Sequence, residues 1–186
     1  REFTLYKRAE ILGYVTKRVF TIAVAGTHGK TTTATILSHL LYQSGIEITA
    51  FLGGISNNYK TNILLSKKNE IFIVEADEYD RSFLQLCPDI AIITSVEADH
   101  MDIYNDLDEL TSAFIKFATQ VKEKGCLFVE NNIDINFPCP KDGNLYRYSA
   151  KEKSHYYAEN IKIKDSKICF DVNFLNIITG IVSEKK

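Results

Sequence analysis

The sequence lacks several features that mark common functional classes. Its four cysteines include no C-x-x-C pair, so the clustered ligands of a zinc site are missing. It contains no run of about 18 apolar residues, so no membrane span is predicted. The formal net charge of −2 gives no reason to expect nucleic acid or an anionic membrane as a partner. Because the N-terminal residues also lack an apolar signal core, we expect a cytoplasmic protein.

Two further absences concern nucleotide recognition. There is no Asn-Lys-x-Asp segment, which a GTPase switch would need to read guanine. There is also no G-x-G-x-x-G motif of a dinucleotide-binding unit. The chain does not begin with Met, and we therefore expect it to be part of a longer polypeptide. Its 186 residues, 45% of them hydrophobic, fit one large domain, or one domain with an appendage, and can bury a substantial core.

The stretch that organises the sequence begins at residues 19–25, a continuous apolar and β-branched run. Such a run predicts a strand buried on both faces of a parallel sheet. A helical pattern of apolar residues occupies 36–41. Between the two lies the segment Gly26-Thr27-His28-Gly29-Lys30-Thr31-Thr32. Strand, glycine loop and helix in this order are the context of a phosphate-binding P-loop.

The residue types in this loop suit a nucleotide. Glycines let the backbone curl so that successive N–H groups point at phosphate oxygens, and the following helix adds its positive N-terminal end. Lys30 is expected to reach the β- and γ-phosphates of ATP, and the Thr31 hydroxyl to lie on Mg²⁺. Val24 stands where the usual pattern has its first glycine, and the alternative is a tight turn whose glycines serve geometry only. The residues assigned to the nucleotide are Gly26, Thr27, His28, Gly29, Lys30, Thr31 and Thr32.

Strand and helix patterns alternate along the chain as far as about residue 135. Apolar runs predict strands at 46–52, 71–74, 90–94 and 126–129, and helical spacing predicts helices over 6–15 and from about 106. Asn105 or Asp106 is expected to cap the second of these helices, with Glu109 closing a capping box. The alternation predicts an α/β fold over about 1–135, with a mostly parallel sheet and helices on both faces. Short alternating runs over about 144–182 predict an antiparallel β appendage, in which residues 173–182 fit a strand or a helix.

Two of the predicted strands end in acidic clusters. In open parallel sheets ligands bind outside the carboxyl ends of the strands, so both clusters are expected beside the P-loop. Glu75, the first carboxylate after the 71–74 run, is in the position of a Walker B acid that holds magnesium. Asp77, Glu78 and Asp80 are interpreted as solvated loop charges.

His100 lies in the second acidic cluster, between Asp99 and Asp102. This position makes it a candidate ligand of a second metal ion or a contact to the transferred phosphate. The alternative is an ordinary loop histidine that is hydrogen-bonded to its acidic neighbours. The metal ligands predicted are Thr31, Glu75 and His100, and the catalytic residues predicted are Lys30 and His100.

Three segments together resemble the Mur ligase family. They are residues 25–33, residues 75–84 (Glu-Ala-Asp-Glu-Tyr-Asp-Arg-Ser-Phe-Leu) and residues 97–104 (Glu-Ala-Asp-His-Met-Asp-Ile-Tyr). Their order and spacing make the resemblance specific over about residues 5–135, and this family also uses a P-loop without the usual first glycine. The sequence is most similar to the members that join L-alanine to UDP-N-acetylmuramate.

The resemblance implies an ATP-dependent ligase of peptidoglycan precursor synthesis. In this family ATP phosphorylates the carboxylate of the substrate, and the amine of L-alanine attacks the acyl phosphate. By motif position Lys30 would steady the transferring phosphate. Thr31 and Glu75 would hold one Mg²⁺, and His100 a second. Cations in these places neutralise the repulsion between a carboxylate and a triphosphate.

The resemblance further implies that residues 1–186 are most of a central ATPase domain, which would bind nucleotide without ligating. Ser95 departs from the family, in which many members have Asn. One alternative is the ligase that attaches a tripeptide to UDP-N-acetylmuramate, although residues 82–88 favour the alanine-adding members. Folylpolyglutamate synthase is more distant. A P-loop nucleotide-binding module without an activity of its own is the remaining alternative.

Overall fold

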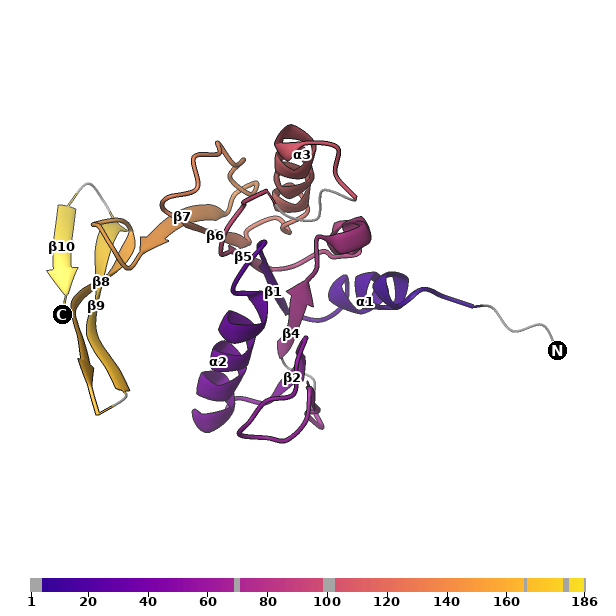
Figure 1. Cartoon of the computed structure of the whole chain (residues 1–186), viewed down its shortest axis with the longest axis horizontal. Helices are drawn as coiled ribbons and strands as arrows, with labels where there is room; N and C mark the ends of the chain where they lie inside the picture. Colours follow the sequence, from indigo (N-terminus) through magenta and orange to yellow (C-terminus); the bar gives the residue numbers. More distant parts are fainter. Residues whose placement is uncertain (1–4, 69–70, 99–102, 166, 179–180, 186) are drawn as a thin grey trace.

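The computed structural model of the chain describes residues 5–68, 71–98, 103–165, 167–178 and 181–185 (Figure 1). The helices are α1 (Arg8–Thr16), α2 (Lys30–Gln43) and α3 (Leu107–Ala118), and a 3₁₀ helix η1 spans Tyr79–Gln85. The strands are β1 (Thr21–Ala25), β2 (Ile48–Phe51), β3 (Ile63–Leu64), β4 (Ile71–Ala76), β5 (Ile90–Ile93), β6 (Cys126–Glu130), β7 (Asn144–Ser149), β8 (Tyr156–Lys164), β9 (Lys167–Ile178) and β10 (Ile181–Lys185). In the part of the chain that is described, no helix is long and apolar enough to cross a bilayer.

The described strands form one mixed sheet in the order β10-β9-β8-β7-β6-β5-β1-β4-β2-β3. All neighbouring pairs from β2 through to β8 in this order are parallel. Antiparallel pairs lie at the two ends of the sheet, where β3 pairs with β2, and where β9 pairs with both β8 and β10. The predicted α/β fold, with a mostly parallel sheet and antiparallel strands toward the C-terminus, is confirmed.

Helices cover both faces of the sheet because its central strands are apolar on both sides. All five residues of β1 are buried, and consecutive residues point to opposite faces. Ala23 packs on the face that holds the aromatic side chains Phe83 of η1 and Phe117 of α3. Val24 packs on the other face, against Ala34 of α2. The continuous apolar pattern of 19–25 therefore places the following loop at the centre of the sheet's carboxyl edge.

Strand β7 corrects the predicted start of the antiparallel appendage. The sequence predicts antiparallel pairing from about residue 144, whereas β7 pairs in parallel with β6, with Leu127 opposite Leu145. The long connection 131–143 explains the difference, because a parallel pair needs a crossover of about a dozen residues and a hairpin needs only two. Antiparallel pairing begins with β8 and β9. A division of the chain near residue 135 remains a prediction.

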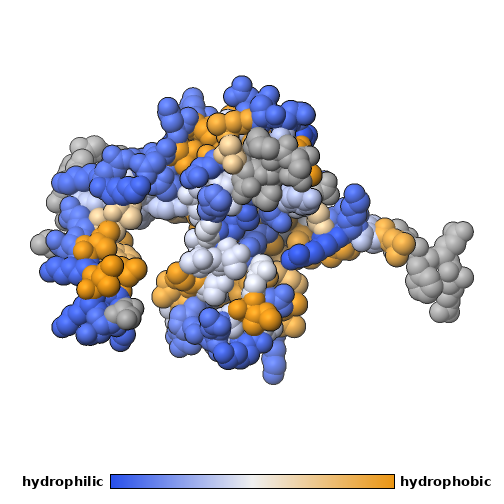
Figure 2. Space-filling model, in the orientation of Figure 1, coloured by the Kyte–Doolittle hydropathy of each residue, from blue (hydrophilic) through white to orange (hydrophobic). Residues whose placement is uncertain are grey.

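Strands β8 and β9 form a hairpin that stands away from α2 (Figure 1). Residues 173–178, which fitted a strand or a helix, continue β9, and β10 follows. One face of the hairpin is apolar and exposed: the register partners Ile163 and Ile168 are 80% and 66% exposed. Figure 2 shows apolar side chains gathered on this hairpin, separated from the main body of the molecule.

Candidate functional site

The polar ends of three neighbouring strands meet at one edge of the sheet. Strand β1 lies between β4 and β5, and all three run in the same direction. Residues 26–29 follow β1, Glu75 is near the end of β4, and residues 94–97 follow β5. The structure therefore brings together the P-loop, the first acidic cluster and the beginning of the second. His100, together with residues 99–102, lies outside the described residues.

The glycine loop has the backbone geometry that its sequence predicts. Gly26 has φ +138° and Gly29 has φ +84°, values that favour glycine. A Cβ atom on Gly26 would lie 2.1 Å from the Thr94 hydroxyl oxygen, so a side chain does not fit there. Gly29 is the N-cap of α2, whose first turn contains Lys30, Thr31 and Thr32. The assigned nucleotide residues thus form one continuous loop and helix N-terminus.

The residues that follow β5 hold this loop in shape. Thr94 Oγ1 donates to the His28 carbonyl oxygen at 2.6 Å, and Ser95 Oγ accepts from the His28 amide at 2.8 Å. The Thr27 and Ser95 hydroxyl oxygens are 3.0 Å apart. The sequence marks Ser95 only as a departure from the family, but in the structure its hydroxyl bonds directly to the P-loop. The His28 ring faces Glu97 at 3.8 Å, and because both side chains are mostly exposed this contact is weak.

Thr31 and Glu75 are joined directly. The Thr31 hydroxyl donates to Glu75 Oε2 at 2.9 Å, and the backbone N–H of Gly53 donates to Glu75 Oε1. A hydroxyl and a carboxylate are oxygen ligands of the kind that Mg²⁺ prefers, so the pair suits the predicted metal. Among the described residues there is no cluster of three or more His, Cys, Asp or Glu side chains with metal-binding geometry. The pair offers two protein oxygens to a magnesium ion and leaves coordination positions for phosphate oxygens and water.

Lys30 makes a contact that the sequence does not predict. Its ammonium donates to the Gly26 carbonyl oxygen at 2.7 Å and to both carboxylate oxygens of Glu78 at 2.9 Å. The Glu78 side chain is completely buried and that of Lys30 is 16% exposed. The interpretation of Glu78 as a solvated loop charge is wrong, whereas its neighbour Asp77 is exposed. A run of acidic residues carries no sequence signal for which member turns inward, because that depends on the chain around it.

Tyr104 supports the turn that contains Glu78. It is fully buried, and its hydroxyl donates to the Glu78 carbonyl oxygen at 2.6 Å. Burial raises the pKa of Tyr104 to about 12, and the Arg81 guanidinium, 5.3 Å from the ring centroid, opposes this shift. Arg81 also pairs with Glu109 at the start of α3. Tyr104 is thus a buried neutral donor on the segment that leads from the second acidic cluster into α3.

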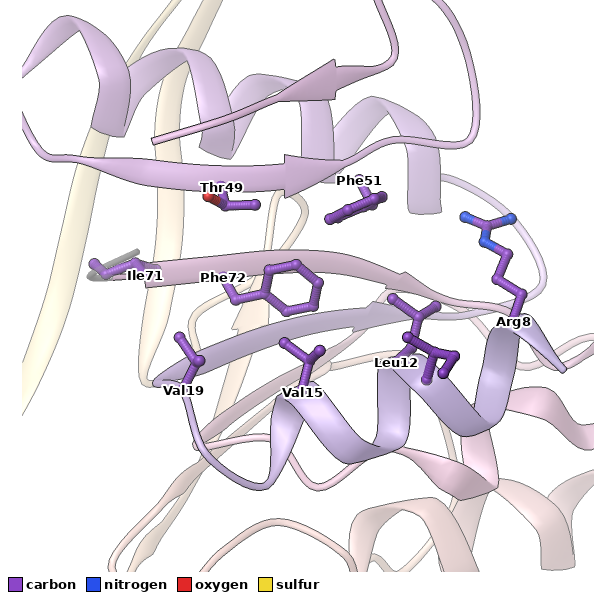
Figure 3. A pocket seen from close by; sticks show the side chains of 9 residues that line it. Arg8, Leu12, Val15, Val19, Thr49, Phe51, Ile71 and Phe72 are labelled. Atoms are coloured by element: carbon purple, nitrogen blue, oxygen red, sulfur yellow. The ribbon is translucent and has the colours of Figure 1, made fainter. Parts of the chain in front are cut away.

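A separate apolar groove lies between α1 and strands β2 and β4 (Figure 3). It has a volume of about 400 Å³ and is formed by α1, Val19, β2 and the first two residues of β4. In Figure 3, Leu12 and Val15 of α1 point toward Phe72 of β4. Its polar lining residues are Thr49 and Arg8, and the others are apolar. The groove therefore differs in chemistry from the P-loop edge, which is lined by hydroxyl and carboxylate groups.

This fold and edge define an α/β protein with a P-loop, and comparison with known proteins identifies its family. The model of the Mur ligase middle domain matches residues 24–183, so the chain belongs to the Mur ligase family. It is 47% identical over 172 residues to a UDP-N-acetylmuramate–L-alanine ligase of Flavobacterium johnsoniae, covering 92% of this chain and 36% of the relative. It is 42% identical over 184 residues to the same ligase of Phocaeicola vulgatus, covering 96% and 40%.

Solved structures agree on the fold. A UDP-N-acetylmuramate:L-alanyl-γ-D-glutamyl-meso-diaminopimelate ligase of Neisseria meningitides superposes with a TM-score of 0.74 at 24% identity, over 89% of this chain and 56% of that one. The UDP-N-acetylmuramate–alanine ligase of Thermotoga maritima gives 0.73 at 24% identity, over 95% and 40%. The chain spans little more than a third of the length of the curated relatives it matches. The roles of Lys30, Thr31 and Glu75 stay predictions.

Proposed function

We propose that this chain is the ATP-binding part of a ligase that joins L-alanine to UDP-N-acetylmuramate. The observation that carries the proposal is the direct contact of Thr31 with Glu75, beside Lys30, at the carboxyl edge of the sheet. The curated relatives bear this activity in their names. As parts of the same proposal, residues 1–135 form the nucleotide-binding core, the protein is cytoplasmic, and neither nucleic acid nor a membrane is a partner.

In this proposal the chain's own residues bind and stabilise the negative charge of the nucleotide phosphates. Backbone N–H groups of Gly29 and of the first turn of α2 would bind phosphate oxygens, helped by the positive end of the helix. The Lys30 ammonium would stabilise the negative charge on the phosphoryl group as it moves to the substrate carboxylate. Thr31 and Glu75 would hold Mg²⁺, which neutralises phosphate charge when bound. His100 is proposed as a ligand of a second metal ion.

Calorimetric titration of the chain with ADP and Mg²⁺ tests nucleotide binding. We expect binding in the chain and a loss of about tenfold or more in affinity in Lys30→Gln. Glutamine is preferred to alanine because it keeps a hydrogen-bond donor on the side of the buried Glu78 carboxylate, whereas Lys30→Ala would remove the donor altogether. Lys67→Gln, an exposed lysine away from the site, makes the same charge change and serves as the matched control. If Lys30→Gln and Lys67→Gln bind ADP with equal affinity, Lys30 is not part of the nucleotide site.

A second test concerns the metals. Mn²⁺ titrated into the nucleotide-bound chain should occupy two sites, measured by electron paramagnetic resonance. Glu75→Gln is expected to remove one site and His100→Ala the other. Loss of both sites in either variant, or of neither in both, would contradict the assignment of separate metals.

The ligase reaction is tested in a hybrid, in which this chain replaces the matching segment of the Flavobacterium johnsoniae relative. We expect the hybrid to release phosphate from ATP when UDP-N-acetylmuramate and L-alanine are present. In its Lys30→Gln variant the rate of phosphate release should be lower by orders of magnitude. The 186-residue chain alone is expected to show no alanine-dependent turnover, because positioning of the two substrates is worth about 7–11 kcal/mol of the barrier. Release that needs a tripeptide in place of L-alanine would favour the alternative ligase.

A further inference from the structure

The ammonium of Lys30 is held on three sides in this structure. A lysine ammonium has three N–H donors, and here they meet the Gly26 carbonyl oxygen and the two carboxylate oxygens of Glu78. The three donor–acceptor distances lie between 2.7 and 2.9 Å, which is the range of charge-assisted hydrogen bonds. Gly26 belongs to the P-loop and Glu78 to the turn after β4, so the ammonium lies between the two segments.

Glu78 is itself firmly placed. A fully buried carboxylate is stable only with partners, and Lys30 supplies the charge that compensates it. Its backbone carbonyl oxygen accepts from the Tyr104 hydroxyl at 2.6 Å and from the Arg81 amide at 3.0 Å. Tyr104 is packed in the core and has no exposed surface. The position of Lys30 is therefore determined through Glu78 by the segment that contains Tyr104.

We propose that Glu78 is a positioning residue for the P-loop lysine, and that Tyr104 holds Glu78 in place for this purpose. The inference rests on the proposed function, in which Lys30 binds the terminal phosphates of the nucleotide. Neither residue needs to touch the nucleotide in order to act.

The physical reason is conformational entropy. Lysine carries a compact charge on a flexible four-carbon stem, and ordering such a side chain costs free energy. A phosphate oxygen would replace one of the two Glu78 oxygens as acceptor, while the remaining bonds to Glu78 and Gly26 keep the stem ordered. Binding of the phosphate then bears less of that cost, and the affinity for the phosphate increases. Without Glu78 the ammonium would be free to turn toward water. The contribution of Lys30 to the recognition of the γ-phosphate would then fall.

A neighbouring ion pair provides a matched control. Arg81 and Glu109 also form an ion pair, and Arg81 lies over the ring of Tyr104. The Arg81–Glu109 pair is partly exposed, and the Glu109 carboxylate also accepts from the amide of Asn105, just before α3. The Glu78 carboxylate instead accepts from Lys30. Removing the charge of Glu109 therefore disturbs the same region of the fold without changing the acceptors of Lys30.

The experiment compares two ligands on the 186-residue chain. Affinities for Mg-ADP and for the Mg complex of the β,γ-imido analogue of ATP are measured by calorimetry, and their ratio reports the γ-phosphate contact. We expect the analogue to bind more tightly than ADP in the unmodified chain. The ratio should fall about tenfold in Glu78→Gln, because an amide keeps the shape but loses the charge-assisted bonds to Lys30. It should fall about threefold in Tyr104→Phe and stay unchanged in Glu109→Gln.

The ratio separates positioning from a purely structural role. General loosening of the fold would weaken both ligands together and leave their ratio unchanged, and that outcome overturns the inference. An increased ratio in Glu78→Gln would also overturn it, because Glu78 would then compete with phosphate for Lys30. If Glu78→Gln does not fold by circular dichroism, Tyr104→Phe, which keeps the ring in the core, decides the question alone.

Failure of the proposed function gives a different result. If the unmodified chain binds neither ligand, or if Lys30→Gln has the same ratio as the unmodified chain, Lys30 does not contact the γ-phosphate and both proposals fall. If Lys30→Gln abolishes the preference for the analogue while Glu78→Gln and Tyr104→Phe retain it, only the positioning role is wrong.

Discussion

The carboxyl edge of β1, β4 and β5 and the β8–β9 hairpin are held together in different ways. At the edge, several side-chain hydrogen bonds join distant residues, such as Thr31 with Glu75, 44 positions apart, and Glu97 with Thr27, 70 positions apart. In the hairpin they join residues 11 to 14 positions apart, as between Asn160 and Asp171. A residue at the edge depends on several distant segments, whereas a hairpin residue depends mainly on the strand beside it. Substitutions should therefore have larger effects at the edge and in the core beneath it.

The largest expected effect is in that core. Phe117 has no exposed surface and stacks on Phe83, with ring centroids 5.0 Å apart. We expect Phe117→Ala to lower the free energy of unfolding by about 3–5 kcal/mol, because it leaves a cavity. The hairpin equivalent, Phe170→Ala, removes a ring that is 52% exposed and should cost no more than about 1 kcal/mol. Urea unfolding of both variants measures the difference, and similar losses would contradict the comparison.

The next effect concerns the P-loop backbone. In Gly26→Ala the new Cβ would lie 2.1 Å from the Thr94 hydroxyl oxygen, at a φ of +138°. We expect a loss of about 2–3 kcal/mol in unfolding free energy and loss of ADP binding, since the loop must open to admit the methyl group.

Gly45→Ala is the matched control for this prediction. Gly45 also has a positive φ, +79°, but a Cβ there meets nothing within 4 Å. Its substitution should cost about 1 kcal/mol, from the backbone conformation alone, and leave ADP binding unchanged. Equal losses in the two variants would mean that φ, and not the contact with Thr94, limits the residue at position 26.

A further effect is confined to alkaline pH. Burial raises the pKa of Tyr104 and of Tyr148 to about 12, from the ordinary value of 10.0. Between about pH 10 and 12 the unfolded chain loses these protons while the folded chain keeps them, so stability decreases as pH rises through this window. The double variant Tyr104→Phe, Tyr148→Phe should lose less stability over the same interval than the unmodified chain. Urea midpoints across the window measure this, and parallel curves would refute the assignment.

The smallest effect is expected on the hairpin. Ile163 is 80% exposed, and its register partner Ile168 is 66% exposed. Ile163→Thr keeps a β-branched side chain in the strand and should change the unfolding free energy by no more than about 0.5 kcal/mol. A loss of several kcal/mol in urea unfolding would show that this face is covered in solution and would remove the contrast with the core.

Several local features follow directly from the sequence. Asp106 caps α3 and accepts from the Glu109 amide at 2.8 Å, as the capping pattern predicts, although the Glu109 carboxylate reaches back to the amide of Asn105. Gly45 ends α2 with a positive φ. The loop of residues 26–29 leads from a buried strand into a helix. These features depend on interactions between residues that are close in the sequence, so a short stretch of sequence is enough to predict them.

Other features are decided by chain segments that a local pattern does not include. Strand β7 pairs in parallel because the connection 131–143 carries the chain back to the starting end of β6, and no alternation of residues encodes that path. In the run Asp77-Glu78 the two carboxylates have the same sequence environment, yet one is exposed and the other is buried.

By itself the sequence determined the strand, glycine loop and helix of the P-loop, the mostly parallel sheet and the family, because apolar periodicity and turn residues act over a few positions. Only the tertiary structure decided that Glu78 turns inward. Its partners, Lys30 and Tyr104, lie 48 and 26 positions away and meet it only after the sheet has formed. A buried charge is stable where a fold supplies the opposite charge, and that depends on the whole chain.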